Sequence, residues 1–369
     1  MSIKQSISYR ITRELFIQQP DQKDTRVLTV FSENHRLHHG CELKDGAVTP
    51  SFESPQRAET VLARVKSAGL GDVISAQAFD RACYVAAHSE RYVAFLENAW
   101  AEWTATGKTH DALPLVWPVR DLAIDREPGF IDGKLGFYAM DAGAPITGGT
   151  WEAVRSSADV ALTGIQRVID GAPSAFALCR PPGHHAAREY MGGYCYLNNA
   201  AIAAERCLSQ GAKRVAVLDV DFHHGNGTQN IFYDRPDVFF ASLHGDPHVS
   251  YPYFSGFEHE RGAGAGEGFT VNYPLARGTA WASYRQALTD ALIRIVAYKP
   301  DFLVISLGVD TFEDDPISHF KLTSEDFLRL GADIAGAGIA TLFVMEGGYM
   351  VDEIGINAVN TLQGFEGGR

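Results

Sequence analysis

The sequence has few cysteines, and none of them stands in a metal-binding spacing. The five are Cys41, Cys83, Cys179, Cys195 and Cys207. An odd number of scattered cysteines without a CxxC pair argues against a disulfide framework and against a thiolate zinc site. It favours a reducing compartment, and we expect the protein to be cytoplasmic.

Long apolar runs and positive charge are also scarce. No run reaches the length of a membrane span, and the first residues, MSIKQSISYRITRELF, lack the hydrophobic segment of a signal peptide. We therefore expect no membrane contact. The formal net charge of −13 argues against a nucleic-acid partner and is compatible with a small cationic substrate, although solubility alone also explains it.

The chain has no Pro/Ser-rich linker, no break in composition and no internal repeat. Its 369 residues, of which 46% are hydrophobic, are enough for one large globular domain. We predict a single domain over residues 1–369, in which the polar residues 1–26 form a peripheral N-terminal arm.

Short apolar segments alternate with helical patterns along the chain. Strands are predicted at residues 27–31, 175–179, 215–220, 238–243, 302–307 and 341–345, and helices at 54–69, 90–107, 150–171, 198–211, 281–298, 324–337 and near the C-terminus. This alternation predicts an α/β fold with a central, mostly parallel sheet covered by helices on both faces. In such sheets the ligand site lies beyond the carboxyl ends of the strands.

The strand at 215–220 runs into the most reactive stretch of the chain, VAVLDVDFHHGNG. Asp219, Asp221 and His223 follow at spacing two, which places them on one side of an extended chain. Two carboxylates and an imidazole are costly to bury unless a cation lies among them, and oxygen and nitrogen ligands suit zinc. A polar strand end with surface histidines is the alternative.

Three other strand ends carry candidate catalytic groups. His184 and His185 follow the strand at 175–179 and are suited to act as a general base and acid, unless they are a turn histidine and a surface histidine. Asp310 follows the strand at 302–307 as a third metal ligand or a capping residue. Tyr349 follows two glycines after the strand at 341–345. Its phenol can donate to a developing oxyanion, or it is simply a partly buried aromatic.

Two loops complete the pattern. Residues 32–50 contain His35, His38 and His39, which could be ligands; without a strand to fix them, we favour a solvated loop. Residues 113–149 are rich in proline and glycine, which is typical of the wall of a site.

The motifs RPPGHHA, GGYCYLNNAAIAA, VLDVDFHHGNGTQ, SLHGDP, SLGVDTFEDDP and MEGGY occur in this order. Together they resemble the zinc-dependent deacetylase family of histone deacetylases and their bacterial relatives, from about Val27 onward. FSENHRLHHGCEL, GTWEA, DPISHFKLTS and MEGGYMVDEIG most resemble the bacterial acetylpolyamine amidohydrolases within that family. The resemblance implies the arginase/deacetylase fold and hydrolysis of a linear amide by metal-activated water.

The resemblance also assigns residues. It implies that Asp221, His223 and Asp310 hold zinc, with ferrous iron as the alternative metal. It makes His184, His185 and Tyr349 catalytic, with Asp219 orienting His184, Asn226 facing His185, and Gly193 and Tyr194 lining the channel to the metal. Some relatives have Asp at the position of Asn226, so we expect a lower proton affinity for His185 than in those enzymes.

Family members bind potassium as well. The resemblance places a first potassium at Asp219, Asp221, His223, Ser242 and Leu243, and a second at Phe232, Arg235, Val238 and Phe269.

The implied substrate is an acetylated polyamine. Glu42 and Asp132 align with acidic positions of the polyamine enzymes, although both could be ordinary solvated charges. The loops that carry them resemble segments that pair two subunits, which predicts a homodimer. The alternatives are deacetylation of acetyl-lysine in proteins or of other small acyl-amines, an arginase-like binuclear manganese ureohydrolase, and a ligand-binding relative without catalysis.

Overall fold

The computed structural model describes residues 26–369, so the predicted arm at residues 1–26 lies outside the described residues except for Arg26. The strands are β1 (Leu28–Phe31), β2 (Cys41–Lys44), β3 (Ala47–Pro50), β4 (Val73–Ser75), β5 (Ser174–Ala177), β6 (Val215–Asp219), β7 (Val238–Gly245), β8 (Thr270–Leu275), β9 (Phe302–Leu307) and β10 (Thr341–Met345). The helices are α1 (Pro55–Ala68), α2 (Ala82–Val85), α3 (Glu90–Ala105), α4 (Ile131–Phe137), α5 (Thr150–Ile169), α6 (Asn199–Ser209), α7 (Asn226–Phe232), α8 (Trp281–Tyr298), α9 (Ser324–Ala335) and α10 (Val351–Gly367), with short 3-10 helices η1 (Glu33–Leu37) and η2 (Gly264–Gly266).

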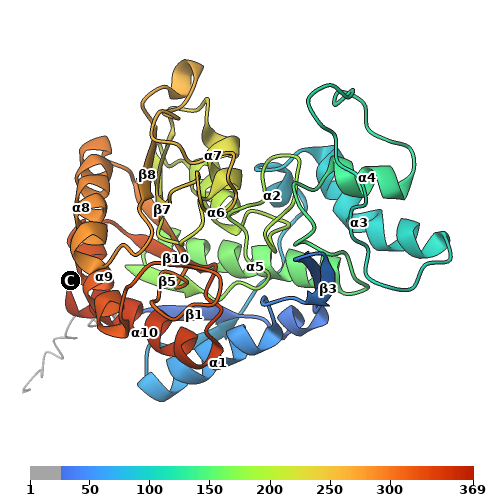
Figure 1. Ribbon diagram of the computed structural model, residues 1–369. Coiled ribbons are helices and arrows are strands. Elements are labelled where there is room, and N and C mark those ends of the chain that lie inside the picture. Colours follow the sequence, from blue (N-terminus) through green and yellow to red (C-terminus); the bar gives the residue numbers. More distant parts are fainter. Residues whose placement is uncertain (1–25) are drawn as a thin grey trace, which may run out of the picture.

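Eight strands form one sheet in the order β4-β1-β5-β10-β9-β6-β7-β8, and every neighbouring pair is parallel. The strands β2 and β3 form a separate antiparallel hairpin. Helices cover both faces of the sheet (Figure 1). The predicted α/β architecture is therefore confirmed.

The two faces of the sheet bury two separate cores. In β9, Val304 joins the core beneath α5 and α6, whereas Leu303 and Ile305 join the core beneath α1, α8, α9 and α10. In β10 the apolar side chains divide in the same way. Strands buried on both faces are continuously apolar, which is why the sequence identified them.

Most predicted elements are confirmed, and β9, β10 and α8 have the predicted ends. The sequence missed the two edge strands. β4 has only three residues, and β8 contains Asn272 and Pro274, so neither presents an apolar run. Among residues 26–369, no helix has the length and apolar character needed to cross a membrane.

The prediction of a solvated loop at residues 32–50 is wrong for two of its three histidines. This segment contains η1 and the β2–β3 hairpin, and His35 and His38 are buried, whereas His39 is exposed. The ring of His38 lies against Tyr196, with Nδ1 at 3.0 Å from the hydroxyl of Thr150. Tertiary packing against α5 therefore orders a segment that has no regular pattern of its own.

Candidate active site

The segments that follow β5, β6, β9 and β10 bring the predicted catalytic residues together, because these strands end at one edge of the sheet. Two glycines make room for the acidic residues there. A Cβ atom on Gly308 would lie 2.0 Å from Asp221 Oδ2, and one on Gly347 would lie 2.5 Å from the same oxygen. Only glycine allows the backbone to approach the carboxylates so closely.

Asp221, His223 and Asp310 converge. The Nδ1 atom of His223 lies 3.2 Å from Asp221 Oδ1 and 2.9 Å from Asp310 Oδ2, and the ligating atoms of the three residues all lie within 4.8 Å of one another. Backbone groups hold both carboxylates. The N–H of Gly347 donates to Asp221 Oδ2 (2.8 Å), and the N–H of Phe222 donates to Asp310 Oδ1 (2.7 Å).

The two carboxylates of this cluster favour a bound cation. Burial alone would lower the pKa of His223, but its hydrogen bonds to Asp221 and Asp310 raise it to about 10. Burial and the neighbouring charge of Asp221 raise the pKa of Asp310 to about 7. Two fully buried carboxylates beside an imidazole form a donor set that fits Zn²⁺, whose charge would replace the proton on His223.

The two adjacent histidines have different partners. His184 Nδ1 lies 3.0 Å from Asp219 Oδ2, and His185 Nδ1 lies 2.6 Å from Asn226 Oδ1. The amide nitrogen of Asn226 faces the hydroxyl of Tyr190 (3.2 Å), so the oxygen of Asn226 accepts the Nδ1–H of His185. This tautomer leaves Nε2 of His185 with a free electron pair.

The pKa values of the two rings diverge as a result. Burial lowers the pKa of His184, but the carboxylates of Asp221 and Asp219 outweigh it and raise the pKa to about 10. Burial, and then the positive charge on His184, hold the pKa of His185 well below its usual value. The pair therefore consists of one imidazole suited to carry a proton and one suited to accept a proton.

Glu346 fixes the loop that carries the histidines, a role that the sequence did not reveal. Its Oε2 atom accepts hydrogen bonds from the N–H groups of Gly183 (2.7 Å) and His184 (3.2 Å), and its Oε1 atom accepts one from the Ser306 hydroxyl (3.2 Å). A carboxylate at the end of β10 was the only signal in the sequence.

A buried salt-bridge network fixes the turn before Tyr349, and the sequence did not predict it. Arg57 donates to the carbonyl oxygens of Glu346 and Gly348, both at 2.6 Å, and its guanidinium lies 4.8 Å from the ring of Tyr349. Glu53 accepts from Arg57 at 2.9 Å, and Arg180 Nε lies 2.8 Å from the same Glu53 oxygen. Such charges are stable in a core only when they are paired.

Above these residues lies a cavity of about 450 Å³. His185, His223 and Tyr349 line its base, and its walls are Glu42, Leu43, Lys44, Asp45, Asp141, Ala142, Gly143, Gly193, Tyr194, Tyr251, Tyr253 and Ile317. The hydroxyl of Tyr194 donates to Glu42 Oε2 at 2.8 Å. Burial raises the pKa of Tyr349 well above its usual value, so its phenol remains a donor.

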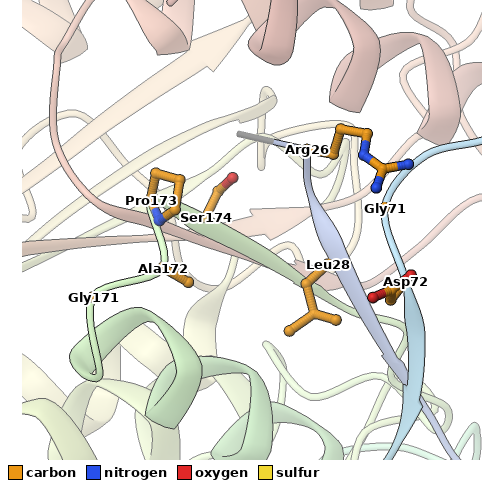
Figure 2. A pocket seen from close by; sticks show the side chains of 8 residues that line it. All are labelled: Arg26, Leu28, Gly71, Asp72, Gly171, Ala172, Pro173 and Ser174. Atoms are coloured by element: carbon orange, nitrogen blue, oxygen red, sulfur yellow. The ribbon is translucent and has the colours of Figure 1, made fainter. Parts of the chain in front are cut away.

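The structure does not bring every predicted residue to this cavity. Asp132 lies on α4, is ion-paired with Lys108, and is not among the lining residues. A second pocket, of about 270 Å³, lies at the amino ends of β1, β4 and β5. Arg26 and Asp72 line one side of it, and Pro173 and Ser174 line the other (Figure 2). It contains none of the predicted site residues.

The predicted potassium ligands lie at the ends of neighbouring elements. Asp219 and Ser242 are register partners in β6 and β7, and Leu243 follows; all three are fully buried. The second set comprises Phe232 at the end of α7, Arg235 in the turn that follows, Val238 at the start of β7, and Phe269, whose carbonyl accepts from the N–H of Phe240. Both sites stay predictions.

Comparisons with known proteins concern the family and the fold of the chain. The histone deacetylase domain matches residues 51–364. Acetylpolyamine amidohydrolase 2 of Pseudomonas aeruginosa is 60% identical over 342 residues, which cover 92% of this chain and 99% of that protein. Acetylpolyamine amidohydrolase of Mycoplana ramosa is 51% identical over 339 residues, with coverage of 92% and 99%. The crystal structure of acetylpolyamine aminohydrolase from Burkholderia pseudomallei superposes with a TM-score of 0.88 at 40% identity, covering 93% of this chain and 99% of that one.

Proposed function

Because the chain belongs to the histone deacetylase family, we propose that it is a zinc-dependent amidohydrolase that removes the acetyl group from acetylated polyamines. One observation carries the proposal. Asp221, His223 and Asp310, a group that could hold a metal ion, include one residue, His223, that lines the same cavity as His185 and Tyr349. Two of the relatives described above are named as acetylpolyamine amidohydrolases.

The residues around the metal perform distinct tasks. Asp221, His223 and Asp310 would hold zinc, which would supply Lewis-acid polarisation of the amide carbonyl and of water. His185, neutral and with its Nε2 electron pair free, takes the proton from the attacking water. His184, whose Nδ1 pairs with Asp219, supplies a proton for the leaving amine. The phenol of Tyr349 donates a hydrogen bond to the developing oxyanion.

The charged side chains that line the cavity favour a cationic substrate. They are the three carboxylates of Glu42, Asp45 and Asp141 and a single lysine, Lys44. Glu42 is buried, and its Oε1 atom has no hydrogen-bond partner among residues 26–369. An unpaired buried carboxylate oxygen is costly, and the N–H groups of a substrate ammonium would satisfy it. Glu42 is therefore the residue that we assign to the polyamine.

A substrate panel tests the proposal. The zinc-loaded enzyme is expected to turn over acetylputrescine and acetylcadaverine with a higher kcat/KM than an acetyl-lysine peptide, and Glu42→Gln is expected to raise KM for acetylputrescine but not for an uncharged N-alkylacetamide. A preference for the peptide would contradict the polyamine assignment. Elemental analysis distinguishes the amidohydrolase from the ureohydrolase alternative. One zinc ion per chain supports the amidohydrolase, and two manganese ions per chain would support the ureohydrolase.

We also propose a homodimer. The segment before α4 projects from the molecule in Figure 1 and exposes the large apolar side chains Leu115, Val116, Val119, Leu122, Ile124 and Phe130. A second copy would cover these side chains, and Asp132 lies directly after them. Sedimentation of the wild type and of Ile124→Glu tests this: a dimer that becomes monomeric supports the proposal, and a monomeric wild type contradicts it.

The potassium sites are proposed as structural. Thermal unfolding in potassium chloride and in sodium chloride of equal concentration should differ, with the higher Tm in potassium. Equal values of Tm would argue against specific potassium binding.

A further inference from the structure

One carboxylate at the wall of the cavity joins three segments of the chain. Asp141 Oδ2 accepts hydrogen bonds from the Gly193 N–H (3.0 Å) and from the Tyr251 hydroxyl (2.6 Å), while Oδ1 accepts from the Gly143 N–H (2.9 Å). These contacts link residues that are 52 and 110 positions apart in the sequence. Unlike Glu42, Asp141 has both oxygens engaged by the protein itself.

The first segment that Asp141 holds is strained and tightly packed. Gly193 has φ of 51° and Tyr194 has φ of 68°, so two consecutive residues are left-handed. A Cβ atom on Gly193 would lie 2.4 Å from Cδ2 of His185 and 2.9 Å from the Tyr251 hydroxyl oxygen. A non-glycine residue such as Tyr194 adopts this conformation only when its surroundings enforce it.

The second segment presents Tyr251 to the catalytic histidines. Its ring centroid lies 5.1 Å from that of His185 and 5.9 Å from that of His223, nearly perpendicular to both. Burial, followed by the charge of Asp141, holds the pKa of Tyr251 well above its usual value, so its phenol is a hydrogen-bond donor to Asp141. The hydrogen bond therefore fixes the position of this ring beside the reacting groups.

We propose that Asp141 is a positioning residue that sets the spacing between the Gly193–Tyr194 wall and the Tyr251 wall. This spacing admits only substrates whose chain is unbranched beside the scissile amide. The inference rests on the proposed amidohydrolase function and adds the origin of its steric selectivity. In this role Asp141 acts through the two walls, since most of the acceptor sites of its carboxylate are already filled by three hydrogen bonds from the protein.

Kinetics of three variants test the inference. Asp141→Ala, Tyr251→Phe and the double variant are compared on acetylputrescine and on an N-acetyl amine with a methyl branch at the carbon beside the nitrogen. The ratio of the two kcat/KM values is expected to fall roughly tenfold to a hundredfold in Asp141→Ala, since ångström-scale misplacement changes rates by such factors. Tyr251→Phe should shift the ratio in the same direction, and the double variant should add little.

Direct contact between Asp141 and the substrate would give a different result. Asp141→Ala would then raise KM for acetylputrescine with no change in the ratio, and Tyr251→Phe, which keeps the carboxylate, would behave as wild type. Either result overturns the inference. Asp170→Ala, at an exposed acidic residue after α5, is the matched control and should leave both substrates unaffected.

A binding measurement separates this inference from the proposed function. Calorimetry on the zinc-loaded protein gives Kd for a straight-chain alkyl hydroxamate and for one branched beside the carbonyl, with zinc content and Tm recorded for every variant. If the wild type fails to hydrolyse acetylputrescine, the proposed substrate is wrong, but a Kd ratio that falls in Asp141→Ala and in Tyr251→Phe still supports the positioning role. An unchanged Kd ratio in both variants overturns that role, whatever the activity.

Discussion

The substitution Asn226→Asp tests the assignment of His185 as the base. It introduces a carboxylate at the position that now offers a neutral amide oxygen to Nδ1 of His185, 2.6 Å away. The hydrogen bond to His185 is retained. The amide N–H groups, which face the Tyr190 hydroxyl (3.2 Å), Met140 Sδ (3.3 Å) and the His185 carbonyl oxygen (3.4 Å), are lost, but the Tyr190 hydroxyl can turn to donate to the new carboxylate.

The expected effect follows from the distance. With the two charge centres about 4 Å apart and an effective dielectric constant of about 20, the attraction between the carboxylate and the imidazolium is about 4 kcal/mol. Since about 1.4 kcal/mol corresponds to one pKa unit, the upper limit is about 3 units, and burial of the new charge reduces it. We expect the pKa of His185 to rise by roughly 1 to 3 units.

The sign of the rate effect is fixed by the role of His185. A base works only when it is unprotonated, so kcat/KM falls as the pH drops through its pKa. Raising that pKa moves the acidic limb of the pH profile to higher pH. The measurement is kcat/KM for acetylputrescine from about pH 5 to about pH 9, on protein of equal zinc content. Because the pKa of wild-type His185 is held well below its usual value, the wild type should stay active to the acidic end of this range, whereas Asn226→Asp should lose activity within it.

A matched variant separates charge from geometry. Asn226→Ala removes the hydrogen bond without adding charge, and it should lower the rate across the profile without moving the acidic limb upward. If Asn226→Asp leaves the acidic limb where the wild type has it, His185 is not the group whose protonation stops the reaction, and the proposed division of roles between His184 and His185 is wrong.

Four further substitutions have defined outcomes. Tyr349→Phe should keep zinc, as measured by elemental analysis, while kcat falls roughly a hundred- to a thousandfold through loss of one oxyanion donor; near wild-type turnover would contradict this role. Asp310→Asn removes one ligand charge, so the protein should lose zinc on dialysis against a chelator that leaves the wild type loaded. Gly193→Ala adds a side chain at a left-handed φ of 51° and 2.4 Å from the His185 ring, so kcat/KM should fall by about a hundredfold with little loss of zinc. Glu53→Gln leaves two buried guanidinium groups without their carboxylate and should lower the free energy of unfolding by about 3–5 kcal/mol in urea titrations, whereas a change below about 1 kcal/mol would refute the pairing.

The sequence predicted those features that have a local cause. β9 and β10 are apolar on both faces, β9 begins after Asp301 and ends before Gly308, and β10 ends before Glu346, so these ends were predicted correctly. The convergence of Asp221 and His223 was predictable because their spacing places both on one side of the strand end. The position of Asp310 then followed from the rule that parallel strands end at one edge of the sheet.

The features that the sequence did not predict depend on contacts between distant segments. Asp141 and Tyr251 are 110 residues apart, and neither lies in a periodic segment that would fix its direction. The burial of His38 depends on α5, more than one hundred residues away. Glu346 was visible as an acidic residue beside two glycines, but its role depends on the backbone of the loop after β5.

The place of β10 in the sheet has a consequence for biosynthesis. β10 is the last strand to leave the ribosome, yet it lies between β5 and β9 and is the link between the half-sheets β4-β1-β5 and β9-β6-β7-β8. The half that carries His184 and His185 therefore cannot join the half that carries Asp221 and Asp310 until residue 345 has been translated. Nascent or prematurely terminated chains should be inert as hydrolases, and their two unjoined sheet edges should make them clients of chaperones and proteases.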